Sequence, residues 1–264
     1  MRSWISRAMI GLCLVLGAVG PATGAIYYVD DVDPANTGDV YTPTAYGSNG
    51  NDGTSSNAPK ATVDNLIAST NLMAGDIIYI DTGTYAPAVI ASTVIGAVGN
   101  PIRFQGSTNG TVFAGSGNII TVSGRYLELR DIVARNGARG FNLSGADYCE
   151  FLRVSAISNS QNSFYIGSSS DSNAVRRSIF HNTAGVYGAF GAEFCRGNYL
   201  ENCVASSPNY GFCPAPGAVT SMVQCIGIGG HATQVAINQQ PRVRELPSLR
   251  APDAKHVQVA PAIE

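Results

Sequence analysis

An internal repeat between residues 127 and 237 is the feature that most limits how this chain can fold. Five segments of similar pattern follow one another, and one aligned apolar position recurs at intervals of 22, 25, 24 and 22 residues. That position is filled by Ile132, Val154, Ile179, Cys203 and Cys225. A period in the low twenties, with Gly and Asn turns and no helical periodicity, indicates one coil of strands per repeat.

Two further columns accompany this one. The column three residues earlier is apolar except for one arginine, and it contains Leu129, Phe151, Arg176, Leu200 and Met222. The column immediately before the first is polar, and it contains Asp131, Arg153, Ser178, Asn202 and Gln224. We therefore predict coils stacked about 4.8 Å apart, with apolar ladders inside and polar ladders outside. Arg176 is either buried with a partner or marks a local kink.

The predicted fold class is all-β, a right-handed parallel β-helix with a short N-terminal cap helix. Charged residues make up only 13% of the chain, about half their share in an average soluble domain. Gly, Ser, Asn and Thr replace them, which suits short strands joined by many turns. A β-sandwich of evenly spaced strands is the alternative.

The residues before the repeat predict a secretory leader. Arg2 and Arg7 precede an apolar run, and Pro21 and the small residues 22–24 follow it. This is the pattern of a signal peptide cut before Ala25. The run is shorter than the ~20 residues that cross a bilayer, so we expect a chain without a transmembrane segment after the leader is removed. We predict a secreted protein, extracellular or in the cell envelope.

A polar run, GSNGNDGTSS at residues 47–56, comes before the expected cap helix. Val63, Leu66 and Leu72 fall near helical spacing, and DIIYIDTGTY at residues 76–85 alternates as a strand does. A helix here would cover the open end of the sheets. The predicted order is given by four ranges: a signal peptide over 1–24, a strand, loop and cap helix over 25–75, the β-helix over 76–238, and a Pro-rich tail over 239–264 that we expect to be disordered.

Residues 26–85 resemble the N-terminal part of secreted β-helix proteins of the pectate-lyase-like superfamily. The matching pieces are Gly50 to Thr54, Pro59, Lys60-Ala61-Thr62, Gly75-Asp76, Ile78-Tyr79-Ile80 and Gly83-Thr84-Tyr85. The resemblance implies the right-handed parallel β-helix. It leaves the activity open, because the superfamily includes polysaccharide lyases, glycoside hydrolases and epimerases, and the motif carries no catalytic residue.

Acids and arginines of the repeats supply a candidate lyase site. Such a lyase needs carboxylates that hold Ca²⁺, a base and a cation for the developing charge. Lysine is scarce, so the base would be an arginine or a histidine. The candidate catalytic residues are Arg153, Arg176, Arg177 and His181, and the candidate calcium ligands are Asp147, Glu150 and Asp171. The alternative is that they are solvated turn residues and surface ion pairs.

Two other groups of residues have candidate roles. Exposed tyrosines suit a wet sugar-binding face, and the candidates are Tyr148, Tyr165, Tyr187 and Tyr199; the alternative is that they pack in the core. An N-terminal group of oxygen ligands could hold a second Ca²⁺ or form plain turns, and it contains Asp31, Asp33, Asn36, Asp39, Asn49, Asn51 and Asp52. Cys203 and Cys225 are expected to stack as thiols inside the coils, with a disulfide as the alternative.

A secreted surface protein that binds polysaccharide, or has a structural role in the cell envelope, is the function that the sequence favours. The array of repeats is short, and long loop insertions are missing from it. A Ca²⁺-dependent polysaccharide lyase that acts on an acidic polysaccharide by β-elimination is the first alternative. A glycoside hydrolase is the second, although the repeats lack the NTD, DD, GHG and RIK motifs of the polygalacturonases of this superfamily. Nucleic acid is excluded as a partner, since the chain has no basic cluster and its pI is about 5.9.

Overall fold

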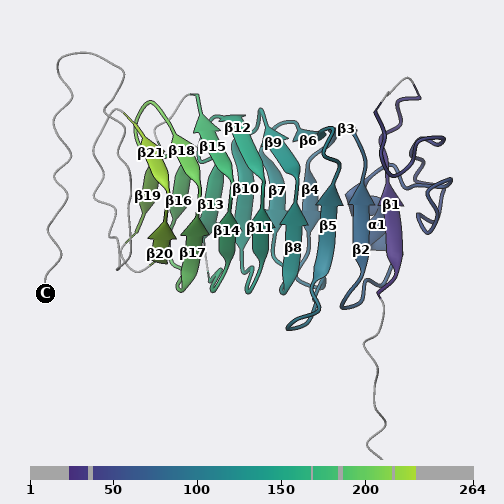
Figure 1. Cartoon of the computed structure of the whole chain (residues 1–264), viewed down its shortest axis with the longest axis horizontal. Helices are drawn as coiled ribbons and strands as arrows, with labels where there is room; N and C mark the ends of the chain where they lie inside the picture. The colour runs from purple at the N-terminus through teal and green to yellow at the C-terminus, as the bar shows by residue number, and fades with distance from the viewer. Residues whose placement is uncertain (1–23, 35–37, 168, 184–186, 216–217, 230–264) are drawn as a thin grey trace, which may run out of the picture.

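Residues 24–34, 38–167, 169–183, 187–215 and 218–229 are described by the computed structural model. They form a right-handed parallel β-helix whose coils stack along the long axis of the molecule (Figure 1). This confirms the predicted fold class. The leader, Asn36 and the tail over 239–264 lie outside the described residues. No helix in the described ranges is long and apolar enough to cross a membrane.

Three parallel sheets make up the walls of the β-helix. The eight-stranded sheet contains β1 (Ile26–Val29), β2 (Ile77–Ile80), β5 (Ile102–Gly106), β8 (Leu127–Arg130), β11 (Glu150–Leu152), β14 (Ala174–Arg176), β17 (Asn198–Glu201) and β20 (Val219–Val223). The seven-stranded sheet contains β3 (Gly83–Tyr85), β6 (Thr111–Ala114), β9 (Ile132–Arg135), β12 (Ser155–Asn159), β15 (Ile179–Asn182), β18 (Val204–Ser206) and β21 (Ile226–Ile228). The six-stranded sheet contains β4 (Ala88–Ile90), β7 (Asn118–Val122), β10 (Arg139–Ser144), β13 (Phe164–Gly167), β16 (Phe190–Ala192) and β19 (Phe212–Pro214).

The chain bends from the eight-stranded to the seven-stranded sheet at one residue in each of five successive coils. The residue is left-handed, with φ between 51° and 55°, and it is Asp131, Arg153, Arg177, Asn202 or Gln224. Polar residues tolerate this conformation when their surroundings fix it. This column is the outward polar ladder that the repeat predicted, except that Arg177 and not Ser178 occupies it.

The predicted alignment is therefore wrong by one residue in the third repeat. Phe151 pairs with Val175, and Val175 pairs with Leu200, so Arg176 lies in the neighbouring outward row. Ser178 is buried in the interior column, whereas Ile179 is 51% exposed. A slip of one residue moves side chains to the opposite face of a strand, which explains why the sequence alignment placed Arg176 in an apolar column.

Phenylalanine rings fill the interior behind the six-stranded sheet. Phe141, Phe164, Phe190 and Phe212 are paired in register from coil to coil. The centroids of successive rings in this ladder lie 5.3, 5.8 and 5.7 Å apart. Parallel, in-register pairing stacks the side chains at equivalent positions of successive coils. The phenylalanine ladder therefore packs neighbouring coils against one another in one continuous core.

Two ladders of buried asparagines satisfy the backbone at the other turns. Asn173 accepts from the Cys149 amide at 3.0 Å, and Asn198 accepts from the Asn173 amide at the same distance. Asn159, the last residue of β12 before the turn to the six-stranded sheet, accepts from the Gly137 amide at 3.1 Å. A buried amide that meets its partners avoids the ~1–3 kcal/mol cost of an unsatisfied polar group.

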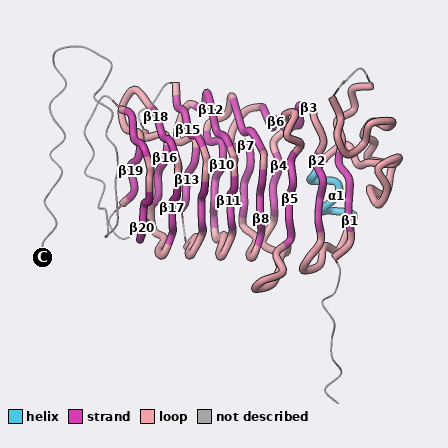
Figure 2. Tube along the Cα trace, in the orientation of Figure 1, coloured by secondary structure: helices cyan, strands magenta, loops and turns pink. Residues whose placement is uncertain are grey.

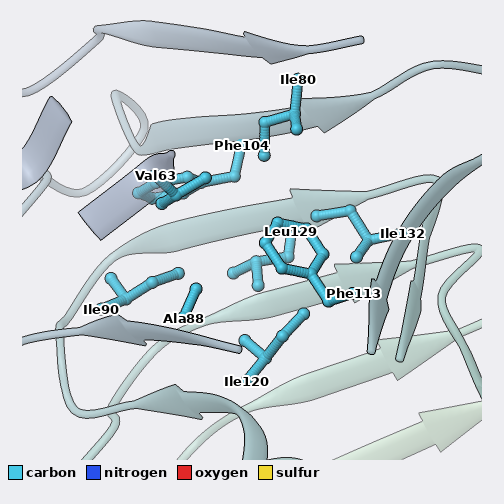
Figure 3. A pocket seen from close by; sticks show the side chains of 9 residues that line it. All are labelled: Val63, Ile80, Ala88, Ile90, Phe104, Phe113, Ile120, Leu129 and Ile132. Carbon is cyan, nitrogen blue, oxygen red and sulfur yellow. The ribbon is translucent and has the colours of Figure 1, made fainter. Parts of the chain in front are cut away.

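The predicted cap helix is α1 (Val63–Ser69), shorter than the pattern suggested (Figure 2). The Thr62 hydroxyl accepts from the Asn65 amide at 3.2 Å and begins the helix, as an N-cap residue does. Val63 faces Ile80, Phe104 and Ile120 around a small apolar space beneath the helix (Figure 3). The helix thereby covers the N-terminal end of the core.

Two of the predicted N-terminal calcium ligands accept hydrogen bonds from nearby backbone amides and a hydroxyl. Asp31 accepts from the amides of Asp33 and Thr84, and Asp52 accepts from the amide and hydroxyl of Thr54. The five described cysteines are free, and Cys203 and Cys225 are both buried, which agrees with stacked thiols. In the described residues, no group of three His, Cys, Asp or Glu side chains is arranged to hold a metal ion.

Replacement of buried Asp30 by Asn will flatten the dependence of stability on pH. Burial, and then the charge of Asp39, raise the pKa of Asp30 to about 7, against roughly 3.9 in an unfolded chain. Between these two pKa values the folded state binds a proton that the unfolded state has lost. The contribution of Asp30 to the melting temperature therefore falls as pH rises from about 4 to about 7. Asp30→Asn should raise the melting temperature at pH 8 and change it little at pH 4, measured by circular dichroism. An equal change at both values would contradict this.

Candidate functional site

The four predicted catalytic residues lie on different surfaces. Arg153 and Arg177 occupy the left-handed turn column, and Arg153 binds Asp131 through two hydrogen bonds of 2.7 Å. Arg176 lies on the outer face of the eight-stranded sheet, between Glu150 at 2.5 Å and Glu201 at 3.1 Å. His181 lies in β15 of the seven-stranded sheet, and its Nδ1 is 2.7 Å from the Ser206 hydroxyl. Arg153 and Arg176 form ion pairs with acids of neighbouring coils, and neither converges with His181.

The three predicted calcium ligands are not brought together. Asp147 pairs with Arg125 at 3.1 Å and accepts from the Asp171 amide at 3.0 Å. Asp171 accepts from the Arg196 amide at 2.6 Å. Glu150 is on the neighbouring sheet and is paired with Arg176. Each carboxylate thus holds a turn or a strand, and the arrangement does not fit a metal ion.

The four predicted sugar-binding tyrosines are also spread out. Tyr148 is in the turn from the six-stranded to the eight-stranded sheet, and Tyr187 is in the loop between β15 and β16. Tyr199 lies in β17, beneath the Arg176 guanidinium, whose Cζ is 5.4 Å from the ring centroid. Tyr165 lies on the outer face of the six-stranded sheet, and it belongs to a second cluster.

That second cluster joins a cation, a phenol and a carboxylate, and we call it the Arg139 cluster: Arg139, Asn142, Tyr165 and Glu193. The Arg139 Nη1 donates to the Asn142 Oδ1 at 2.8 Å. Its Cζ lies 4.0 Å from the centroid of the Tyr165 ring, within the range of a cation–π contact. The Tyr165 hydroxyl donates to the Glu193 Oε2 at 3.4 Å.

Strand alternation and two glycines position this cluster. Phe141 and Phe164 pair on the inner face, so the next pair along the strands, Asn142 and Tyr165, faces outward. A Cβ added at Gly167 would lie 2.4 Å from the Tyr165 Cε1, and one at Gly191 would lie 3.3 Å from its Cδ2. Glycine at both positions therefore lets the tyrosine ring lie along the sheet, where it meets Arg139.

The charges around Tyr165 favour its protonated form. Burial, followed by the charge of Glu193, raises the pKa of the Tyr165 hydroxyl, and Arg139 only partly opposes this. The phenol is therefore a proton donor at neutral pH. The Arg139 Nε is buried and cannot reach a ligand, but the residue as a whole is only half-buried, so the positive charge of its guanidinium can attract an anionic group. In this cluster, Arg139 can bind a carboxylate, Glu193 can accept a proton, and Tyr165 can donate one.

Sequence reasoning named Tyr165 but not its partners. Arg139, Tyr165 and Glu193 come from successive coils at intervals of 26 and 28 residues, longer than the repeat intervals, so an alignment of repeats does not place them in one column. The sequence feature that could have indicated part of this cluster is the alternation of inward and outward residues along each strand. It places Asn142 outward, next to inward-facing Phe141, and Glu193 directly follows β16. It does not place Arg139, which is two residues before Phe141 although its guanidinium lies over the Tyr165 ring.

The comparisons with known proteins agree with the fold. A family model described as chondroitinase B matches residues 59–155, less than half of the chain. A rhamnogalacturonan lyase structure is 21% identical over 79% of this chain, with a TM-score of 0.56. The structure of pectate lyase Pel9A is 17% identical over 81% of this chain, with a TM-score of 0.57. No curated protein matches the chain.

These likenesses establish the pectate-lyase-like β-helix as the fold. The identities are low, so they carry the architecture alone. The chain spans 58% of the rhamnogalacturonan lyase and 57% of the pectate lyase. The matched family segment includes Arg139 and Asn142 but ends at residue 155, before Tyr165.

Proposed function

We propose that this chain is a polysaccharide lyase, which cleaves an acidic polysaccharide by β-elimination at the Arg139 cluster. The observation that carries the proposal is the Arg139–Tyr165–Glu193 line on the outer face of the six-stranded sheet. The likeness to polysaccharide lyases supports it. The sequence favoured binding or a structural role; these findings support the catalytic alternative better.

The first step of the proposed reaction is recognition of a uronate. Arg139, held by Asn142, donates hydrogen bonds to the sugar carboxylate. A guanidinium suits this task because its planar donors match a carboxylate in pairs. Neutralising the carboxylate also makes the hydrogen on the adjacent ring carbon more acidic. Arg139 thereby performs the task that the sequence assigned to Ca²⁺, for which the described acids do not form a site.

The second step moves two protons. The Glu193 carboxylate takes the proton from C5 of the uronate, the C4–C5 double bond forms, and the bond from C4 to the glycosidic oxygen breaks. Tyr165 donates its proton to the leaving oxygen, and the phenolate regains a proton from Glu193 across their 3.4 Å contact. The products are an unsaturated uronate and a new reducing end, so the atoms and protons of the reaction balance without a co-reactant. Positioned acid and base groups of this kind contribute about 10²–10⁴-fold each.

A substrate panel tests this function. The chain is incubated with polygalacturonate, rhamnogalacturonan, alginate, dermatan sulfate and a neutral glucan, and the ultraviolet absorbance of the C4–C5 double bond is followed. We expect absorbance to rise with at least one acidic polymer and not with the glucan. New reducing ends without the absorbance change would instead indicate hydrolysis, and no reaction on any acidic polymer would overturn the proposal.

A further inference from the structure

A stacked pair of tyrosines stands apart from the Arg139 cluster. The rings of Tyr126 and Tyr148 have centroids 5.0 Å apart and planes only 6° from parallel. Both residues are in the turn from the six-stranded to the eight-stranded sheet, one coil apart, and Tyr148 is 55% exposed. The pair contributes nothing to the core. The proposed elimination does not use it either.

The backbone at these two positions is in a conformation that bulky residues rarely adopt. Tyr126 has a φ of 52° and Tyr148 a φ of 55°. The next coils make the same turn with Ser172 at 59° and Gly197 at 70°. A left-handed residue other than glycine costs of order 1 kcal/mol or more. Because small residues make the turn elsewhere, the fold does not require aromatic rings here, which points to a role on the surface.

One face of the Tyr148 ring is left open by its neighbours. Tyr126 covers the opposite face, and the equivalent turn positions of the next two coils hold Ser172 and Gly197. Arg196 precedes that glycine, and its side chain is exposed. In the described part of the chain it makes no ion pair, while Arg125, beside Tyr126, is paired with Asp147. Arg196 is two coils from Tyr148, so a sugar ring stacked on the open face would lie between the tyrosine and the guanidinium, an arrangement that suits a sugar carrying a carboxylate.

We propose that Tyr148, supported by Tyr126 and flanked by Arg196, is an accessory binding site for a uronate residue of the polysaccharide. The C–H face of the pyranose stacks on Tyr148 above Ser172, and the carboxylate lies toward Arg196. The site is at the end of the six-stranded sheet, the sheet that carries the Arg139 cluster, so one extended chain can contact both. The identity of the polymer rests on the proposed function, but the binding itself does not.

The test is affinity electrophoresis in gels that contain polygalacturonate, alginate or dermatan sulfate. Glu193→Gln serves as the background, so that the polymer stays intact. Tyr148→Gly suits the positive φ, so we expect its melting temperature to be kept or raised while the dissociation constant for the polymer rises about three- to ten-fold. Tyr46→Ala is the control, because Tyr46 is similarly exposed, at 57%, but lies in the N-terminal loop.

The outcomes separate this proposal from the proposed function. Weaker retardation of Tyr148→Gly alone supports the accessory site, whether or not the wild type forms unsaturated products. Equal retardation of Tyr148→Gly and its background, an equal loss in Tyr46→Ala, or no retardation in any gel overturns it. If the wild type is retarded but forms no unsaturated product, the accessory site stands and the lyase proposal fails.

Discussion

Tyr165→Phe should lower kcat/KM on an acidic polysaccharide about 10²- to 10⁴-fold, with little change in melting temperature. The variant loses the hydroxyl that donates toward Glu193 at 3.4 Å. It keeps the ring that contacts Arg139, whose Cζ is 4.0 Å from the centroid. The loss should appear in kcat more than in KM, because the hydroxyl acts on the leaving oxygen and the ring still helps to place the guanidinium.

The matched control is Tyr199→Phe. Tyr199 also lies beneath an arginine, at 5.4 Å from Arg176, and burial also raises the pKa of its hydroxyl. It is on the eight-stranded sheet, away from the Arg139 cluster, so its variant should keep wild-type turnover. Initial rates of double-bond formation measure both variants. Equal rates for the two would remove Tyr165 from the reaction, and a deficit in Tyr199→Phe would move the site to the other sheet.

Phe164→Ala should lower the free energy of unfolding by about 3–5 kcal/mol, the range found for buried Phe→Ala substitutions. Phe164 is fully buried, and its ring centroid lies 5.0 to 5.8 Å from four other rings, those of Phe141, Phe151, Phe180 and Phe190. The substitution removes the centre of a ladder that crosses several coils. The cavity is enclosed by stacked strands whose hydrogen bonds limit their collapse, so we expect the upper part of this range.

Phe194→Ala is the control for the core prediction. Phe194 is 83% exposed and directly follows Glu193, so its replacement should change the free energy of unfolding by no more than about 0.5 kcal/mol. Urea denaturation followed by far-ultraviolet circular dichroism measures both variants. Similar losses in the two would mean that the phenylalanine ladder does not hold the coils together.

The fold followed from the sequence because its information is periodic. Leu129, Phe151 and Leu200 recur at one position of each coil, and a parallel β-helix repeats each position along its axis. The one error in register, at Val175 and Ile179, arose where two apolar residues fit either of two alignments. Only the left-handed turn at Arg177 distinguishes these alignments, and polar turn residues are too interchangeable to reveal it in one sequence.

The candidate site did not follow from the sequence because it is not periodic. Arg139, Tyr165 and Glu193 meet across the six-stranded sheet through side chains that lean along the molecule, and the intervals between them differ from the repeat. Two glycines decide the position of the Tyr165 ring, and their effect depends on contacts in three dimensions. Charge clustering in the sequence pointed instead to Arg153 and Arg176, whose partners are the acids of neighbouring coils.

The most direct test of the central claim is the mass of the products formed from an acidic polysaccharide in water enriched in ¹⁸O. Elimination at the Arg139 cluster predicts unsaturated oligosaccharides that are lighter than hydrolysis products by one water and carry no ¹⁸O from bond cleavage, with Glu193→Gln forming almost none. Saturated products with one ¹⁸O per cleaved bond, or unsaturated products formed equally well by Glu193→Gln, would contradict the account.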